Sequence, residues 1–147
     1  MLDDDRAVWN ELVAVLDAHP DGVLHDPASD WQWNARDIYC HLARWMNYSM
    51  DGFSAELSSD APPAALKGSE DEINRRWQSE DQGVPFSEAR RRAHDAFDRR
   101  VRLIRSVAPE RWNARLEKLA RFDGADHYRQ HLSYIVVTSP ESASPQS

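Results

Sequence analysis

Two histidines, His127 and His131, stand four residues apart near the end of the chain. On a helix this spacing places both imidazoles on one face, one turn apart, where they can reach a single metal ion. Six histidines in 147 residues give roughly 0.24 such pairs by chance, so the spacing alone is weak support. Tyr128, Leu132 and Ile135 fall on the same side of the helix, which predicts that the pair points inward. Two inward imidazoles need a polar partner, because unpaired buried polar groups are costly, and a metal satisfies both.

His41 is the third candidate ligand. It lies between Ile38, Leu42 and Trp45 on the apolar stripe of an earlier predicted helix. A lone inward histidine is more often a core residue hydrogen-bonded to a neighbour, but beside the later pair we interpret it as a ligand. Three neutral imidazoles would leave an open coordination position. Ligation by nitrogen alone suits zinc, nickel, iron or copper, and not magnesium or calcium.

Other residues that could do chemistry have simpler interpretations. His19, His25 and His94 are expected in surface or capping roles. The single cysteine, Cys40, cannot form an intrachain disulfide and is predicted to be a small buried residue rather than a ligand or nucleophile. Tyr128 stands where the zinc-protease motif H-E-x-x-H has its glutamate, so the general base of that mechanism is missing. No catalytic residue and no organic cofactor site can be named from the sequence.

The candidate ligands must be positioned by helices, because apolar residues recur at helical spacing in four segments. The predicted extents are Asp3 to His19, Asn34 to about Leu57, Ser87 to Pro109, and Asp123 to about Ile135. Asn34 is expected to cap the second helix in a capping box with Asp37, and Asp123 to cap the last. Residues 110–121 show a poor helical pattern, and no segment alternates as a strand would.

Long connections separate these helices. The prolines and glycine of residues 60–68 indicate a linker, and Ser69 with Glu72 forms a second capping box that opens a short helix through Trp77. We therefore predict an all-α fold, a four-helix bundle with long inter-helix loops. Residues 1–138 form one domain with one core, and the polar tail 139–147 is expected to be disordered.

Composition excludes some classes of partner. A net charge of −7 argues against general nucleic-acid binding and against an anionic membrane surface. The start of the chain has no signal-peptide pattern and no segment is apolar enough to span a membrane, so we expect a cytoplasmic protein. Glu88, Asp95 and Asp98 are interleaved with the arginine runs of 90–92 and 99–102, which predicts a solvated, salt-bridged helix face. The six tryptophans are interpreted as core residues rather than walls of a pocket.

Three stretches of the chain resemble one known family. They are WNARDIYCHLARW (33–45), EINRRW (72–77) and DHYRQHLSYI (126–135). In this order they resemble the DinB-like superfamily of metal-binding four-helix bundles. That superfamily includes the N-terminal domain of mycothiol-dependent maleylpyruvate isomerases, bacillithiol transferases and DfsB-type resistance proteins. The HL of the first stretch and the HxxxHL of the last are moderately specific when taken together.

The resemblance implies a metal site at His41, His127 and His131, holding zinc or nickel, and a homodimer. It also implies a small-molecule substrate and a low-molecular-weight thiol, such as mycothiol, activated at the metal. A bound cation can do this because it lowers the pKa of a thiol. The printed chain ends soon after the last motif, without the second domain of the isomerases, so we expect a reaction other than maleylpyruvate isomerisation.

We consider three functional hypotheses, and the third, nucleic-acid binding through the arginine-bearing helix, is not expected. The first is a metal-dependent enzyme that acts on small molecules by thiol transfer or a related addition or hydrolysis. The second is a non-catalytic protein whose metal or pocket serves ligand binding, sequestration or fold stability.

Four residues near the candidate ligands have two interpretations each. Asp37 lies one turn before His41, and Asp126 precedes His127, so either carboxylate could orient a ligand imidazole. Capping of the first helical turn explains both acids more simply. Asn74 and Trp77 lie in the linker-helix motif, where they could line a pocket or anchor the linker.

Overall fold

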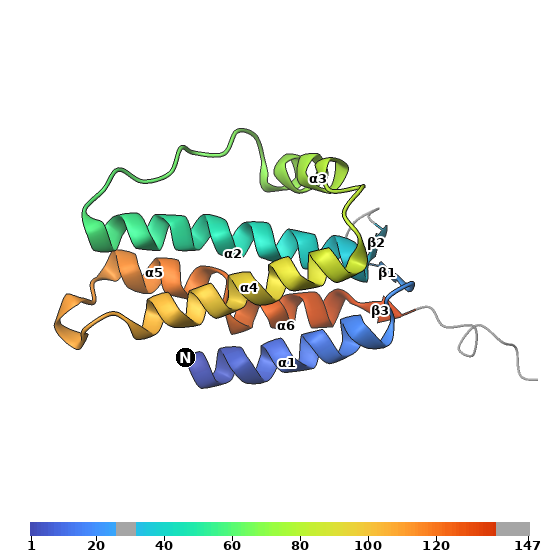
Figure 1. Ribbon diagram of the computed structural model, residues 1–147, viewed down its shortest axis with the longest axis horizontal. Coiled ribbons are helices and arrows are strands. Elements are labelled where there is room, and N and C mark those ends of the chain that lie inside the picture. Colours follow the sequence, from blue (N-terminus) through green and yellow to red (C-terminus); the bar gives the residue numbers. More distant parts are fainter. Residues whose placement is uncertain (26–31, 138–147) are drawn as a thin grey trace, which may run out of the picture.

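The computed structural model describes residues 1–25 and 32–137. Three long helices run side by side: α1 (Leu2–Ala18), α2 (Ala35–Ser58) and α4 (Phe86–Arg105). The fourth position of the bundle is shared by α5 (Ala114–Phe122) and α6 (Ala125–Tyr134), which follow one another along its length (Figure 1). The predicted all-α fold is confirmed, and the segment with the poor helical pattern contains α5. The predicted disordered tail and Trp31 lie outside the described residues.

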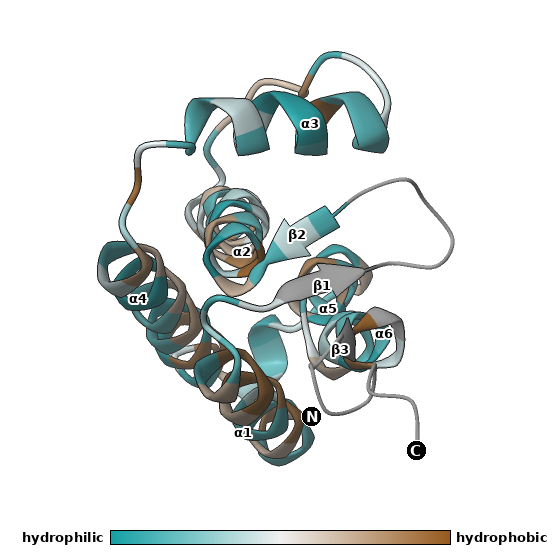
Figure 2. Ribbon diagram, turned by 90° about the vertical axis from the view of Figure 1, so that its right-hand side faces the viewer, coloured by the Kyte–Doolittle hydropathy of each residue, from teal (hydrophilic) through white to brown (hydrophobic). Residues whose placement is uncertain are grey.

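Across residues 1–25 and 32–137, the remaining elements are one further α-helix, a 3-10 helix and three short strands. Helix α3 (Glu70–Glu80) lies across the outside of α2 (Figure 2), and a short 3-10 helix (Pro109–Arg111) connects α4 to α5. Three short strands, β1 (Val23–His25), β2 (Gln32–Asn34) and β3 (Val136–Val137), form an antiparallel sheet in the order β2-β1-β3. This sheet was not predicted, because strands of two or three residues are too short to show an alternation of polar and apolar side chains. The sheet ties the start of α2 to the end of α6.

Two helix starts are as predicted. The Asn34 side chain accepts a hydrogen bond from the Asp37 amide at 2.8 Å, and Asp37 accepts one from the Asn34 amide at 3.1 Å. This reciprocal pair is the predicted capping box. The Ser69 hydroxyl accepts from the Glu72 amide at 3.1 Å and so caps α3. These local hydrogen bonds explain why both starts could be predicted from the sequence.

Two predicted boundaries of α4 are wrong. Helix α4 begins at Phe86, one residue before the predicted start at Ser87 and directly after the extended Pro85. The helix ends at Arg105, so Pro109 belongs to the 3-10 turn that follows. The next helix, α5, begins after Asn113, whose side chain accepts a hydrogen bond from the Leu116 amide.

The start of α6 also differs from the prediction. Gly124 is its N-cap, and Asp123 is the residue that follows α5. The cap is supplied from α1, because the Asp5 carboxylate accepts a hydrogen bond from the Ala125 amide at 2.9 Å. Asp5 also pairs with Arg100 of α4 at 2.7 Å, and both side chains are buried. A long-range hydrogen bond to Asp5 of α1 therefore caps α6, a role that we had predicted for the local residue Asp123.

Buried apolar side chains fill the space between the helices. The larger cluster joins α1, α2, α4 and α6, and includes Trp9 stacked on Phe97 with ring centroids 4.8 Å apart. A smaller cluster joins α2, α4 and α5 around Met50 and Phe53. Trp9, Trp33 and Trp45 are buried, in agreement with the predicted core role, whereas Trp77 and Trp112 are only partly buried. Within the described residues, no helix combines the length and apolar character needed to cross a membrane.

Candidate metal centre

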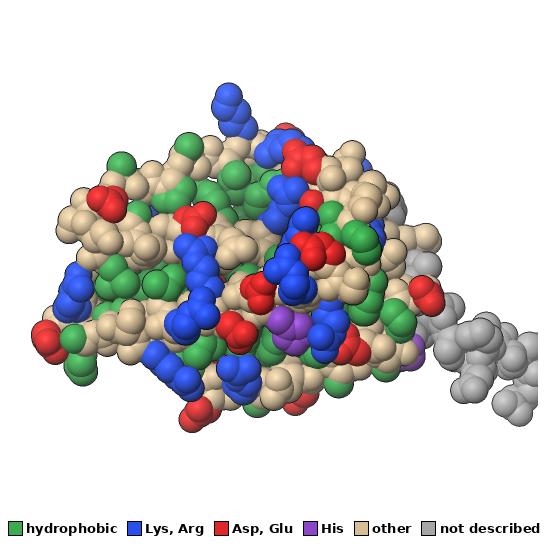
Figure 3. All heavy atoms as spheres, viewed as in Figure 1, with side chains coloured by type: hydrophobic (Ala, Val, Ile, Leu, Met, Phe, Trp, Pro, Cys, Tyr) green, Lys and Arg blue, Asp and Glu red, His purple; other side chains and the backbone are tan. Residues whose placement is uncertain are grey.

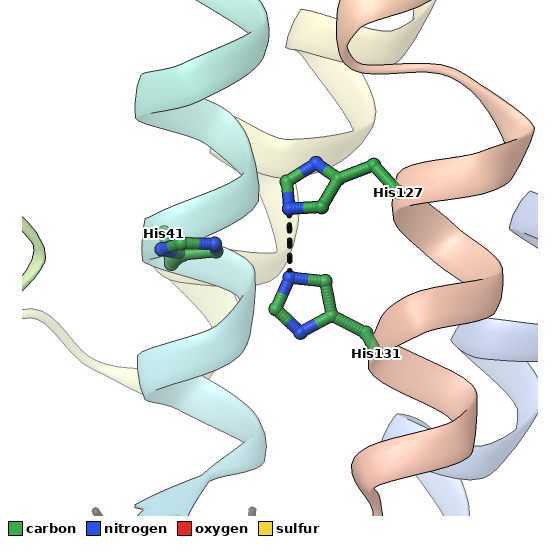
Figure 4. Close-up of side chains that lie close together, drawn as sticks. All are labelled: His41, His127 and His131. Carbon is green, nitrogen blue, oxygen red and sulfur yellow. Dashed lines mark hydrogen bonds between the residues drawn. The ribbon is translucent and has the colours of Figure 1, made fainter. Parts of the chain in front are cut away.

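The three predicted ligands meet between two helices. His41 comes from α2, and His127 and His131 come from consecutive turns of α6 (Figure 4). One ring nitrogen from each residue can be chosen so that all three lie within 4.8 Å of one another. The Nε2 atoms of His127 and His131 are 3.0 Å apart. This group could therefore hold a metal ion, as predicted.

The packing of α2 and α6 explains this convergence. His41 is 8% exposed and lies on the same stripe as the buried Ile38, Leu42 and Trp45. On α6, Tyr128 is fully buried and anchors the helix in the larger core cluster. The ring centroids of His41 and His131 are 4.9 Å apart, and those of His41 and His127 are 5.6 Å apart. The predicted inward orientation of the histidine pair is confirmed.

The surroundings lower the pKa of two of the three imidazoles. Burial, together with the neighbouring His131 and His127, lowers the pKa of His41 well below its ordinary value of 6.5. Burial and His127 lower the pKa of His131 to about 3. A neutral imidazole is the form that binds a metal, so His41 and His131 need to lose no proton at neutral pH.

Buried polar atoms without a hydrogen-bond partner in the described part of the chain lie at the same three-histidine site. Both ring nitrogens of His41 are buried and make no hydrogen bond to the described residues. Such orphaned groups are costly in a protein interior and call for a partner. A donor set made only of imidazole nitrogens suits a transition metal such as zinc or nickel, and the residues present fit that group.

Asp123 is a neighbour of the site that the sequence analysis did not identify. Its buried carboxylate oxygen Oδ1 lies 3.1 Å from Nδ1 of His127. A carboxylate on Nδ1 favours the tautomer that leaves the Nε2 lone pair free for a metal. The available signal was the spacing, since Asp123 lies four residues before His127 on the chain, but that aspartate was interpreted as a helix cap.

The two acids that were considered for this role act elsewhere. The side chain of Asp126 is 98% exposed and pairs with Arg129 at 3.3 Å. It lies in the first turn of α6, one position earlier than predicted, because the helix begins after Gly124. The carboxylate of Asp37 is used by the capping box and by Arg36, as the capping interpretation predicted.

Aromatic and amide groups surround the outer side of His41. The rings of Trp33 and His41 meet edge to face with centroids 4.9 Å apart. Trp45, one turn after His41, donates a hydrogen bond from Nε1 to Oδ1 of Asn74 at 2.8 Å. Trp77 packs against Trp45 with ring centroids 4.9 Å apart. Asn74 and Trp77 thus anchor α3 to α2, and both also line a small cavity beside His41.

The remaining candidates have structural roles. Cys40 is buried, and burial raises the pKa of its thiol to about 11, in agreement with the predicted buried residue. His94 does not have the predicted surface role, because its ring is half-buried between Trp9 and Tyr39. The side chain of His25 lies outside the described residues. 

The arginine-bearing face of α4 is salt-bridged, as predicted. Arg91 pairs with Glu88 and Asp95, and Arg90 pairs with Asp17 of α1. Figure 3 shows basic and acidic side chains interspersed over this side of the molecule. Arg100 is the exception, since it points into the core toward Asp5.

Comparisons with known proteins support the fold alone. No protein-family model and no curated protein matches this chain. The crystal structure of an uncharacterised protein from Escherichia coli UTI89 is similar, with a TM-score of 0.69 and 12% sequence identity. The likeness covers 90% of this chain and 89% of that one. It shows a shared arrangement of helices over nearly the whole length.

Proposed function

We propose that this chain binds a divalent transition metal, zinc or nickel, through His41, His127 and His131. The observation that carries the proposal is the convergence of three imidazoles, from two helices, with ligand nitrogens within 4.8 Å of one another. The unpaired nitrogens of His41 and the carboxylate behind His127 support it. Ligation by nitrogen alone disfavours magnesium and calcium.

We further propose a metal-dependent reaction on a small molecule, with a low-molecular-weight thiol as cosubstrate. Three protein ligands leave room for an exogenous group, and a bound divalent cation lowers the pKa of a thiol or water. The chain itself would hold three imidazoles close together, with His41 buried and the other two partly buried. The order of the three family-like motifs supports assignment to the DinB-like superfamily, including its thiol chemistry and its homodimers.

A second candidate function is metal or ligand binding without turnover, and one observation favours it. Each of three described carboxylates near the site contacts another protein group. Asp37 closes the capping box, Asp123 faces His127, and Asp81 pairs with Arg44 at 2.8 Å. Among the described residues, none of these acids is placed to act as a general base on a bound substrate.

Cobalt substitution tests the proposed function, because Co²⁺ reports its ligands through visible absorption. We expect a cobalt spectrum in the wild-type protein that changes when a low-molecular-weight thiol is added. His41→Ala should abolish the spectrum, whereas His19→Ala, outside the site, should not. A cobalt spectrum that no thiol perturbs, with no turnover of thiol-reactive electrophiles, would favour the binding function instead. Absence of any cobalt spectrum in the wild type would contradict both.

A further inference from the structure

Asn74 occupies a defined orientation between α3 and α2. Its side chain is more than nine-tenths buried, and its Oδ1 accepts the hydrogen bond from Nε1 of Trp45 at 2.8 Å. An indole N–H can only donate, so the amide oxygen, and not the amide nitrogen, must face Trp45. The partner thus fixes an amide orientation that is otherwise hard to assign. A carbonyl oxygen has a second lone pair, which stays available for another donor.

His41 offers such a donor on the side that faces away from the other histidines. Figure 4 shows one ring nitrogen of His41 directed toward His127 and His131, and the other directed away from them. His41 and Asn74 line the same small cavity between α2 and α3, which has a volume of about 10 Å³. That volume accommodates at most a single water molecule.

Three other residues that line the cavity, Asp37, Asp81 and Gln78, make polar contacts with other groups. Asp37 accepts hydrogen bonds from the Asn34 amide and from Arg36. Asp81 makes a bidentate interaction with Arg44, and Gln78 donates to Asp37 at 3.4 Å. Among the described residues that line the cavity, the Asn74 oxygen is therefore the acceptor best placed for the outer N–H of His41.

We propose that Asn74 is a positioning residue of the metal centre. Held by Trp45, its amide oxygen accepts the outer N–H of His41, directly or through one water, and the inner ring nitrogen then presents its lone pair to the metal. Histidine ligands commonly need such a partner, which fixes the tautomer and the ring orientation. The inference rests on the proposed metal site, and it makes the docking of α3 on α2 part of metal binding.

Paired substitutions at Asn74 test the proposal in the full chain. Asn74→Leu removes the acceptor at similar size, while Asn74→Asp keeps an oxygen that can accept from both Trp45 and His41. We expect zinc affinity, measured by competition with a chromophoric chelator, to fall about 10- to 100-fold in Asn74→Leu. It should stay close to the wild-type value in Asn74→Asp and in the control Gln78→Leu, which changes the same cavity wall.

Trp45→Phe keeps the proposal testable if Asn74→Leu does not fold. The phenyl ring retains an aromatic contact with Trp77 but lacks the N–H that holds the amide, so zinc affinity should fall here as well. Circular dichroism and thermal melting identify the variants that are folded. Unchanged zinc affinity in folded Asn74→Leu and Trp45→Phe would overturn the inference, although the proposed metal site would stand.

A metal-free measurement separates this inference from the proposed function. The ¹⁵N NMR shifts of the His41 ring report which nitrogen carries the proton and whether it is hydrogen-bonded. We expect these shifts to change in Asn74→Leu and Trp45→Phe, and to be retained in Gln78→Leu. If the wild type binds no zinc but the shifts change, the proposed function fails and the contact between Asn74 and His41 remains supported. Unchanged shifts in both variants would overturn the contact itself.

Discussion

Asp123 places a buried carboxylate beside the proposed ligand His127. Its Oδ1 lies 3.1 Å from His127 Nδ1, so it favours the tautomer with Nε2 free. We predict that Asp123→Asn weakens zinc binding about tenfold or more, because an amide stabilises that tautomer less well than a carboxylate. Chelator competition measures the change. Asp126→Asn is the matched control, since the exposed Asp126 points away, and equal affinities in the two variants would contradict the assigned role.

His94 predicts a pH dependence that is separate from the metal ligands. Burial, and then Arg90, lower its pKa below the ordinary 6.5. As the pH falls below about 6.5, His94 is protonated in the unfolded chain before it is protonated in the folded protein. The contribution of the neutral, buried His94 to the free energy of unfolding is therefore fully present above this pH and is lost as the pH falls. In metal-free protein, the unfolding free energy should drop more steeply between about pH 7 and about pH 5 in the wild type than in His94→Leu. Parallel urea titrations that give equal slopes against pH would contradict this.

At the scale of elements, the break between α5 and α6 is set by close packing. A Cβ on Gly124 would lie 2.7 Å from Arg100 Nη2 and 2.9 Å from Asp5 Oδ1, inside the buried ion pair that caps α6. We predict that Gly124→Ala lowers the unfolding free energy by about 1–3 kcal/mol, as overpacking does. Urea denaturation measures it. Gly83→Ala, whose Cβ would meet nothing within 4 Å, is the control, and equal losses would rule out the packing argument.

Helix starts with local caps could be predicted from the sequence, whereas features that depend on contacts between distant segments could not. Helices α2 and α3 were predicted because their caps, Asn34 and Ser69, are local residues that bond within the next turn. The start of α6 was misplaced because its cap, Asp5, comes from the other end of the chain. The sheet was missed because backbone pairing between β1 and β3 leaves no periodic pattern in segments so short.

At the scale of the whole molecule, the bundle places ligands far apart in sequence against each other. His41 could be predicted as a ligand because its helical stripe and the later histidine spacing both indicate inward rings. Asp123 and Asn74 could not be assigned from spacing, because their contacts depend on how α5 ends and on how α3 lies across α2. The resemblance indicated that Asn74 belongs to a motif, but the hydrogen bond that it accepts from Trp45 could be identified only from the structure.

This architecture predicts that metal binding stabilises the entire fold. A site that joins α2 to α6 binds only when both are packed, so free metal at about 100 times its dissociation constant adds about 2.7 kcal/mol. We therefore expect zinc or nickel to raise the melting temperature of the wild-type protein. Magnesium should not, because it disfavours an all-nitrogen site. A zinc-induced rise of equal size in His41→Ala would show that the metal stabilises the fold from another place.

The central claim is that His41, His127 and His131 together hold one metal ion. Elemental analysis of the purified protein, equilibrated with zinc and then dialysed against metal-free buffer, tests it most directly. The three single alanine variants and His19→Ala are treated in the same way. The account predicts about one zinc per chain in the wild type and in His19→Ala, and little in each of the other three. No zinc in the wild type, or full zinc content in the three variants, would contradict it.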